Sequence, residues 1–598
     1  MPALFRELWG ILTARQRRYV FAAQALSLLM AASTMTGIAA IAPFFAVLGD
    51  PGLIDRQPVL HWLYVTGSFT DKRHFVVALG SGFVLVVLIV NLINGLGSLA
   101  LNRLALSIGT DLQSRLFREY LGRPYQFHTV THSAVLFNNV VYETARISGG
   151  ILQTTFQLIT NCVTALLIVL SVLLLNPAAC LAMLIGLGGG YVVIYLGMRN
   201  LLLRRGQEQS RLLTEQAQIA NESFGAIKEI TLLQVQEYFR AKFDHVSSAV
   251  ARIIAQVQAT GQSPKNIMEC VAVAGLVGIS LTLAQRDEGI GPWLGQLTFL
   301  AFAVYRLLPI LQQVYAGVVR IRADRPGFNL IAPDLRAASA ATDRGAPLER
   351  AWLERPVRDI RLNGVSFRYN AGSHYAVSDV SLRIPARSTV GLVGVSGSGK
   401  TTLADLVAGL LTASAGRIEV DGVELTESNR SAWQGRISYV PQVVALLDTS
   451  IASNIALGVA KAQVDLQRVA LVARLAQLDN WVRTLPDGLE HLIGERGARL
   501  SGGQRQRIGI ARALYRDTSV LILDEATNAL DGMTEQELMS TLGGLRSRFT
   551  TILIAHRFTT VRTCDEIFQL ENGRLVGSGT YEELLERSDT FRRMAGVS

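Results

Sequence analysis

Six apolar stretches in the first half of the chain limit what it can fold into. They cover residues 20–47, 75–102, 150–175, 177–198, 265–286 and 290–317. A helix of about 20 apolar residues crosses the ~30 Å hydrocarbon core of a bilayer. Because that core offers no water to backbone polar groups, a helix, which satisfies its own, is the expected form. The sequence therefore predicts a membrane domain of six transmembrane helices within residues 1–323.

Basic residues between these stretches indicate how the helices are oriented. Arg15, Arg17 and Arg18 precede the first stretch, and more arginines and lysines occupy the loops after the second and the fourth. Cytoplasmic loops carry an excess of such residues, so we expect both termini in the cytoplasm. The net charge of +10 then belongs to these loops, and no long basic run indicates a nucleic-acid partner.

The long loops have apolar residues at three-to-four spacing, which is typical of helices. We expect the membrane helices to continue into the cytoplasm as two helical hairpins, with turns near Tyr125–Phe127 and Ser223–Ile227. The first outer loop, at residues 50–69, is also apolar. It is either a short amphipathic helix on the outer leaflet or an ordinary loop, and its spacing favours neither.

The second half of the chain has the pattern of a soluble domain. Residues 324–356 are rich in alanine, proline and charge, which indicates a linker. After them, short β-branched strands alternate with helical segments, as in a parallel sheet covered by helices. We therefore expect residues 357–598 to form a separate α/β domain.

A phosphate-binding loop stands near the start of this domain. Residues 388–403, STVGLVGVSGSGKTTL, contain the pattern GxxxxGK[ST] after an apolar strand and before a helix. The backbone N–H groups of such a loop wrap phosphates. Lys400 is expected to reach the terminal phosphates and Thr401 to bind Mg²⁺. The other nucleotide contacts predicted here are Gly394, Ser396, Gly397, Ser398, Gly399 and Thr402.

Two acidic residues and a second anion-binding pattern complete this prediction. Asp524 ends the apolar strand SVLILD, where ligands bind in open α/β sheets, and is expected to hold Mg²⁺. Glu525 follows and is placed to polarise a water that attacks the phosphate. Between these motifs, LSGGQ opens a helix, so its N-terminus is another phosphate site. Its expected contacts are Ser501, Gly502, Gly503 and Gln504.

Together these motifs resemble an ATP-binding cassette (ABC) domain, and with six spans ahead of it the whole chain resembles an ABC exporter half-transporter. The resemblance implies a dimer in which each ATP, with Mg²⁺, lies between one chain's P-loop and the other chain's LSGGQ. We expect a homodimer from these paired half-sites, and a heterodimer with a sister chain is the alternative. It also implies four residue roles. Tyr369 would stack on adenine, Gln442 would sense Mg²⁺ and the attacking water, Asp531 would be the D-loop aspartate, and His556 the γ-phosphate switch.

Charged residues in the last two spans bear on the cargo. Lys265 begins the fifth span and Arg306 lies inside the sixth. Charges within a membrane usually face a cavity or a partner. Glu269 is four residues after Lys265 and can pair with it on one helix face. Arg306 has no acidic residue within a helical turn, so its partner is a carboxylate from elsewhere in the protein, the end of a long cytoplasmic helix, or an anionic substrate.

Three strings, FGAIKEITLLQVQEYF, SPKNIMEC and YRLLPILQQV, resemble the PglK-like flippases of lipid-linked oligosaccharides. That resemblance implies an ATP-driven flippase in a bacterial inner membrane, which moves a polyprenyl-pyrophosphate-linked oligosaccharide from the cytoplasmic side. Lys265 and Arg306 would contact the pyrophosphate. The alternatives are an exporter of lipid A, other amphiphiles or drugs, and a regulator or channel that does not pump.

Overall fold

The computed structural model describes residues 2–40, 44, 47–48, 51–175, 177–284, 290–343, 356–369, 374–528, 532–545, 548–555 and 557–596. Its contacts divide the chain into two compact units. The first, here called the membrane unit, comprises Met1–Arg123 and Thr131–Gly345. The second, the nucleotide unit, comprises Pro124–Val130 and Ala346–Ser598.

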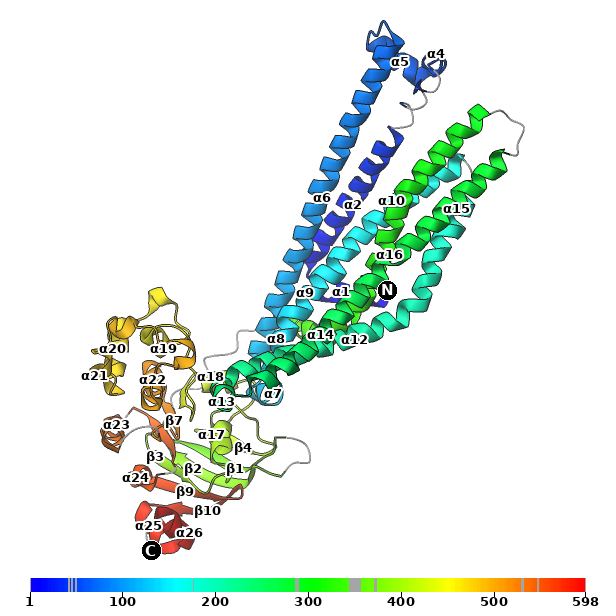
Figure 1. Cartoon of the computed structure of the whole chain (residues 1–598). Helices are drawn as coiled ribbons and strands as arrows, with labels where there is room; N and C mark the ends of the chain where they lie inside the picture. Colours follow the sequence, from blue (N-terminus) through cyan, green and yellow to red (C-terminus); the bar gives the residue numbers. More distant parts are fainter. Residues whose placement is uncertain are drawn as a thin grey trace. The chain divides into compact units, whose positions relative to one another are not determined.

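Long helices make up the membrane unit (Figure 1). Its α-helices are α1 (Pro2–Ile11), α2 (Ala14–Ala39), α4 (Leu53–Arg56), α5 (Pro58–Thr66), α6 (Lys72–Gly122), α8 (Ser133–Asn138), α9 (Thr144–Arg146), α10 (Gln153–Leu175), α11 (Pro177–Met183), α12 (Gly190–Gly225), α13 (Ile227–Leu232), α14 (Gln236–Gln262), α15 (Pro264–Ala284) and α16 (Ile290–Asp343). The π-helical segments η1 (Asn139–Glu143), η2 (Ile147–Leu152) and η3 (Leu184–Gly189) lie between them.

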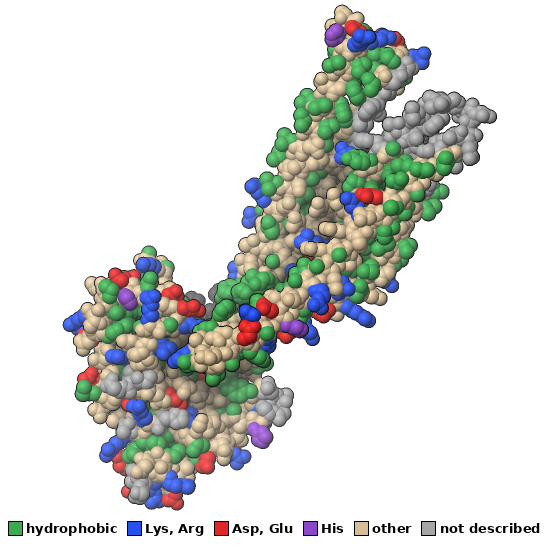
Figure 2. Space-filling model, in the orientation of Figure 1, with side chains coloured by type: hydrophobic (Ala, Val, Ile, Leu, Met, Phe, Trp, Pro, Cys, Tyr) green, Lys and Arg blue, Asp and Glu red, His purple; other side chains and the backbone are tan. Residues whose placement is uncertain are grey.

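Four of these helical stretches are long and apolar enough to cross a membrane, within the part of the chain that the structure describes. They are Ala14–Gly37, Lys72–Gly122, Ser133–Leu174 and Leu184–Gly225, and they overlap the first four predicted spans. The predicted fifth and sixth spans coincide with α15 and the first half of α16. Apolar side chains of α6, among them Val77, Leu88 and Leu92, are exposed. Figure 2 shows hydrophobic side chains along the outside of these helices, as expected of surfaces that face lipid.

Several helices are much longer than a bilayer is thick. Helix α6 has 51 residues, so it is about 77 Å long at 1.5 Å per residue. Short helices lie at both predicted cytoplasmic turns, α7 (Tyr125–Val130) at the first and α13 at the second. Helix α16 runs on to Asp343, well into the segment expected to be a linker. The apolar loop that was predicted to lie on the outer side is helical, with α4 and α5 in succession.

Two sheets form the core of the nucleotide unit. One is antiparallel, in the order β2-β1-β4-β5, and the other has the order β10-β9-β3-β8-β7-β6. In the larger sheet every pair is parallel except β9 with β10. The sequence predicted the parallel sheet but not the antiparallel one. The strands are β1 (Asp359–Phe367), β2 (Val377–Pro385), β3 (Thr389–Val393), β4 (Ala415–Val420), β5 (Val423–Glu424), β6 (Ile437–Val440), β7 (Val520–Asp524), β8 (Thr550–Ile554), β9 (Glu566–Glu571) and β10 (Arg574–Gly579).

Helices cover the larger sheet and pack on its buried strands. Strands β3, β7 and β8 are buried over their whole length, which is why they read as continuous apolar runs. Their carboxyl ends lie at one edge of the sheet. The helices of the unit are α7, α17 (Lys400–Val407), α18 (Arg430–Gln434), α19 (Ile451–Ile455), α20 (Leu466–Leu475), α21 (Asp479–Val482), α22 (Gly502–Tyr515), α23 (Gly532–Gly544), α24 (Phe558–Val561), α25 (Tyr581–Arg587) and α26 (Asp589–Ala595).

Candidate functional site

The predicted phosphate loop joins β3 to α17 and is built on glycines. Gly397 and Gly399 have φ of +78° and +98°, a region that favours glycine. A Cβ at Gly399 would also lie 2.3 Å from the carbonyl oxygen of Ala376. The loop therefore closes tightly over the N-terminus of α17. Ser396 lies in the same loop, and Thr402 lies in the first turn of α17.

Lys400 is buried at the base of this loop. Its Nζ donates hydrogen bonds to the carbonyl oxygens of Gly394 and Val395, both at 2.9 Å. Burial lowers the pKa of Lys400, and the nearby Glu525 and Asp524 oppose that shift. The hydroxyl of Ser398 is buried and has no hydrogen-bond partner among the described residues. A buried ammonium and an unpaired hydroxyl in one loop fit a bound phosphate.

Oxygen atoms suited to a divalent cation meet beside the loop. Thr401 Oγ1 lies 3.5 Å from Asp524 Oδ1, and the Tyr439 hydroxyl donates to Asp524 Oδ2 at 3.2 Å. Burial raises the pKa of Asp524. A cation beside that carboxylate would favour its ionised form. Mg²⁺ prefers hydroxyl and carboxylate oxygens, so these residues fit the ion that the sequence predicts here.

Glu525 and Gln442 are brought together next to Asp524. Gln442 Nε2 and Asn528 Nδ2 both donate to Glu525 Oε2 at 2.8 Å. Glu525 has a φ of +51°, which a non-glycine residue rarely adopts. Such strain is concentrated at functional positions. The two amides fix the carboxylate at the end of β7, where it can orient a water but is not itself buried in the strand.

The signature motif caps another helix. Ser501 Oγ accepts a hydrogen bond from the Gln504 backbone N–H, and the Gln504 side chain accepts one from the Ser501 N–H. This capping box begins α22, which is 14 residues long. Ser501 is exposed, with Gly502 and Gly503 following it in the first turn. The N-terminus of α22 is therefore open to a ligand. Asp531 and His556 lie outside the described residues.

Tyr369 lies beside the first turn of α17. Its hydroxyl is 3.1 Å from Thr402 Oγ1, its ring packs edge-on against Phe367, and it is 40% exposed. An exposed ring beside the phosphate loop can stack on a base. Contacts group the short helix α7 with this unit. Burial, and then the nearby Asp405 and Tyr369, raise the pKa of Tyr125 in α7, which places that helix close to the nucleotide site.

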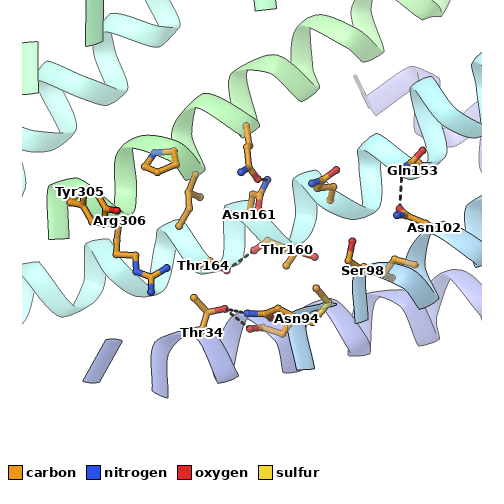
Figure 3. Close-up of a pocket in the computed structure, with 16 residues that line it drawn as sticks. Thr34, Asn94, Ser98, Asn102, Gln153, Thr160, Asn161, Thr164, Tyr305 and Arg306 are labelled. Atoms are coloured by element: carbon orange, nitrogen blue, oxygen red, sulfur yellow. Dashed lines mark hydrogen bonds between the residues drawn. The ribbon is translucent and has the colours of Figure 1, made fainter. Parts of the chain in front are cut away.

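The membrane unit holds a cavity of about 420 Å³ that includes Arg306. Figure 3 shows that α2, α6, α10 and α16 all contribute to its wall. Arg306 Nε is buried and has no hydrogen-bond partner among the described residues. None of the described residues that line the cavity is acidic. Arg306 is thus brought into a cavity without a carboxylate to balance it.

Lys265 has a different environment. Its Nζ lies 3.8 Å from Glu269 Oε1, one helical turn away, and both side chains are about half exposed. This is the pairing that the sequence allowed. Lys265 does not belong to the lining of the cavity around Arg306, so the structure does not bring the two predicted substrate contacts together in one chain.

Sequence reasoning missed the other polar residues of this cavity. Asn94, Ser98 and Asn102 recur every four residues along α6, and Gln153, Gln157 and Asn161 do so along α10. Polar residues at helical spacing within an apolar span were the available signal.

Sequence reasoning also missed Tyr439 and Asp405, which lie next to Asp524 in the nucleotide unit. Burial raises the pKa of Asp405 to about 6.

The domains and sites together define a membrane transporter driven by a nucleotide. A sequence model of the ABC transporter transmembrane region matches residues 18–286, and a model of the ABC transporter nucleotide domain matches residues 377–528. The chain belongs to the ABC transporters, with the domain order of an exporter half-transporter, and is an ATP-hydrolysing exporter. The expected fold class, six membrane helices followed by an α/β ATP-binding domain, is confirmed.

Named relatives agree with this assignment, and a solved structure shares the fold. An ATP-dependent lipid A-core flippase of Methylococcus capsulatus is 31% identical over 94% of this chain and 90% of its own length. One from Alkalilimnicola ehrlichii is 33% identical over 81% of this chain and 82% of its own. A bacterial Atm1-family ABC exporter with ATP bound has a TM-score of 0.81 and 24% identity, with 98% and 99% of the two chains covered. That likeness shows the fold.

Proposed function

We propose that this exporter is an ATP-driven flippase for an anionic lipid of the lipid A-core type. The observation that carries the proposal is Arg306, which is the one charged side chain among the described residues of the membrane cavity. A guanidinium within the membrane costs from about 2.5 to over 10 kcal/mol. Because none of the described residues that line the cavity carries a carboxylate to offset that cost, a phosphate group of a substrate is the partner that its chemistry fits.

The names of the relatives favour lipid A-core over the polyprenyl-pyrophosphate-linked oligosaccharide that local strings of the sequence suggested. The oligosaccharide stays as the second candidate because of the outer helix α5. Val59, Trp62 and Val65 of α5 are 60–68% exposed, which suits contact with a lipid tail. A hydrophobic drug fits less well, since Tyr305 is the one aromatic residue among the described residues of the cavity.

In this proposal the nucleotide unit supplies the driving reaction. Lys400 and the loop glycines hold the phosphates, and Thr401 and Asp524 would hold Mg²⁺, which screens charge on the phosphates. Glu525, held by Gln442, orients the attacking water. Tyr369 stacks on adenine.

Two copies of the chain would complete the sites. The open N-terminus of α22 then faces a nucleotide bound to the partner's P-loop, with Asp531 and His556 in the roles that the family resemblance implies. Both termini lie in the cytoplasm and the membrane is the bacterial inner membrane. Lys265, which has Glu269 as its partner, is a secondary candidate for substrate contact.

The test is ATP-dependent translocation by the full-length protein in liposomes. Three fluorescent probes are compared: lipid A with core sugars, a polyprenyl-pyrophosphate-linked oligosaccharide, and a cationic drug. We expect transport of lipid A-core, at a rate that Arg306→Ala lowers by about tenfold or more. Transport of the drug alone, or normal lipid transport by Arg306→Ala, would refute the proposal.

A further inference from the structure

The lining of the membrane cavity is unusual for a ligand pocket. Such pockets are mostly apolar, with a few placed polar groups. Here ten of the sixteen lining residues are neutral and polar. They are Thr34, Asn94, Ser98, Asn102, Gln153, Gln157, Thr160, Asn161, Thr164 and Gln313. We call this set the polar track, and it lies in helices that also expose many apolar side chains.

The track runs along the helices. Its members on α10 extend from Gln153 to Thr164, which corresponds to about 16 Å of helix. Figure 3 shows the Gln153–Asn102 pair at one end and Arg306 near the other. The cavity of about 420 Å³ is within the range of about 300–1,000 Å³ that holds small ligands. It therefore suits part of a head group rather than a whole lipid with its tails.

Hydrogen bonds between helices account for some of the polar residues in the track. Asn94 Nδ2 donates to Thr34 Oγ1, Gln153 Nε2 to Asn102 Oδ1, and Asn161 Nδ2 to Gln313 Oε1, each at 3.0 Å. Polar side chains commonly join membrane helices in this way. Each such pair still leaves amide N–H or carbonyl groups unused, because an amide has two donor hydrogens and two acceptor lone pairs.

Other members of the track have no such structural role. Among the described residues, Gln157 and Ser98 make no hydrogen bond through their side chains, and both are exposed to the cavity side of their helices. Within a membrane an unused polar group is unfavourable unless a cavity and a ligand satisfy it. Neutral amides and hydroxyls that both donate and accept match the hydroxyl groups of a sugar, whereas a phosphate accepts only.

We propose that the polar track binds the carbohydrate part of the substrate's head group, next to the phosphate contact at Arg306. This inference rests on the proposed function and adds the sugar as the element that the cavity selects. The lipid tails stay outside the cavity in the bilayer. A phosphorylated glycolipid is then preferred over a phosphorylated lipid that has no sugar.

The experiment measures ATPase stimulation of the full-length protein in nanodiscs by two lipids. Lipid A carries phosphates on a disaccharide, and phosphatidic acid carries a phosphate without sugar. The test variant is Ser98→Ala/Gln157→Leu. Asn91→Leu is the matched control, since this amide of α6 bonds to the Val87 carbonyl of its own helix and does not line the cavity.

We expect the test variant to raise the half-stimulating concentration of lipid A by about tenfold, the effect of one or two lost hydrogen bonds. Stimulation by phosphatidic acid should change by less than about twofold, and Asn91→Leu should behave as the wild type. Equal shifts for both lipids, no shift for either, or the same shift in Asn91→Leu would overturn the polar track and leave the flippase proposal intact. If neither lipid stimulates the wild type, the proposed function fails and this inference with it.

Discussion

Arg146 is the centre of a buried ion cluster in the membrane unit, and its removal has a calculable effect. Its Nε donates to Asp324 Oδ1 at 3.1 Å, and its Nη1 donates to Glu143 at 2.9 Å and to Ser210 Oγ at 2.7 Å. Glu143 is fully buried and Asp324 is nearly so. The cluster joins η1, α9, α12 and α16, which come from three distant parts of the chain.

The packing around this cluster leaves no space for relaxation. A Cβ at Gly327 would lie 2.0 Å from Glu143 Oε2, and one at Gly150 would lie 1.8 Å from Asp324 Oδ2. Arg146→Met keeps most of the side-chain volume but removes the cation that pairs with both buried carboxylates, and Arg320 is then the cation left near Asp324. Breaking a buried pair in this way costs about 3–5 kcal/mol. The same change in Arg240, whose pair with Glu237 is exposed, should cost almost nothing.

The penalty should also depend on pH in a defined direction. Burial raises the pKa of Asp324 above 3.8, and Arg146 opposes that shift. For a carboxyl with a raised pKa, the protonated form is the one that folding favours. The stability that the protonated Asp324 carboxyl contributes is therefore complete at pH values below the pKa of this group in the unfolded chain. It is lost as the pH rises through the pKa of the group in the folded protein. Without Arg146 the folded pKa rises further, so the penalty of Arg146→Met should shrink as the pH is lowered towards about 5.

The assay is thermal denaturation of the detergent-solubilised full-length protein, followed by loss of its monodisperse chromatographic peak. Arg146→Met should lower the midpoint temperature of denaturation by several degrees relative to Arg240→Met. The difference between the two midpoints should become smaller at low pH. If the two variants have the same midpoint temperature, or if the difference between their midpoints is the same at about pH 5 and about pH 8, the ion cluster does not stabilise the membrane unit in the way described.

Three further predictions concern the nucleotide unit. Glu525→Gln should lower ATP hydrolysis by about 100-fold or more while a fluorescent ATP analogue still binds, and hydrolysis near the wild-type rate would remove Glu525 from its role. Trp433→Ala should destabilise the unit by about 3–5 kcal/mol, because the ring is fully buried and its Nε1 donates to the Val407 carbonyl at 2.7 Å; an unchanged melting midpoint would contradict this. Tyr439→Phe removes the hydroxyl that donates a hydrogen bond to Asp524, so it should raise the Mg²⁺ concentration for half-maximal ATP hydrolysis by about tenfold or more. A second measurement is the Mg²⁺-dependent quenching of the fluorescence of a bound ATP analogue. An unaltered Mg²⁺ dependence would argue that Tyr439 does not position Asp524.

The features that could be predicted from the sequence are those that depend on residues close to one another along the chain. Apolar windows and the P-loop pattern are local, so the spans overlap the observed helices and Lys400 stands at the start of α17 as expected. The antiparallel sheet depends on the pairing of β1 with β4, whose partner residues are 49 to 60 positions apart, and no local pattern encodes it. Contacts such as Arg146 with Asp324, 178 residues apart, were invisible for the same reason.

Two arginines of the membrane unit, Arg146 and Arg306, show why partner geometry, and not burial alone, bears on function. Arg146 meets two carboxylates, a hydroxyl and a carbonyl, so its charge is balanced by the fold itself. Arg306 meets a cavity of neutral amides and hydroxyls, and its Nε has no partner among the described residues. Neutral groups can solvate a guanidinium but cannot balance it. If Arg306 served structure alone, a carboxylate in place of Gln313 or Thr164 would have stabilised it. A balanced Arg306 would no longer attract an anion, so the absence of that carboxylate from the described cavity is what an anionic substrate requires.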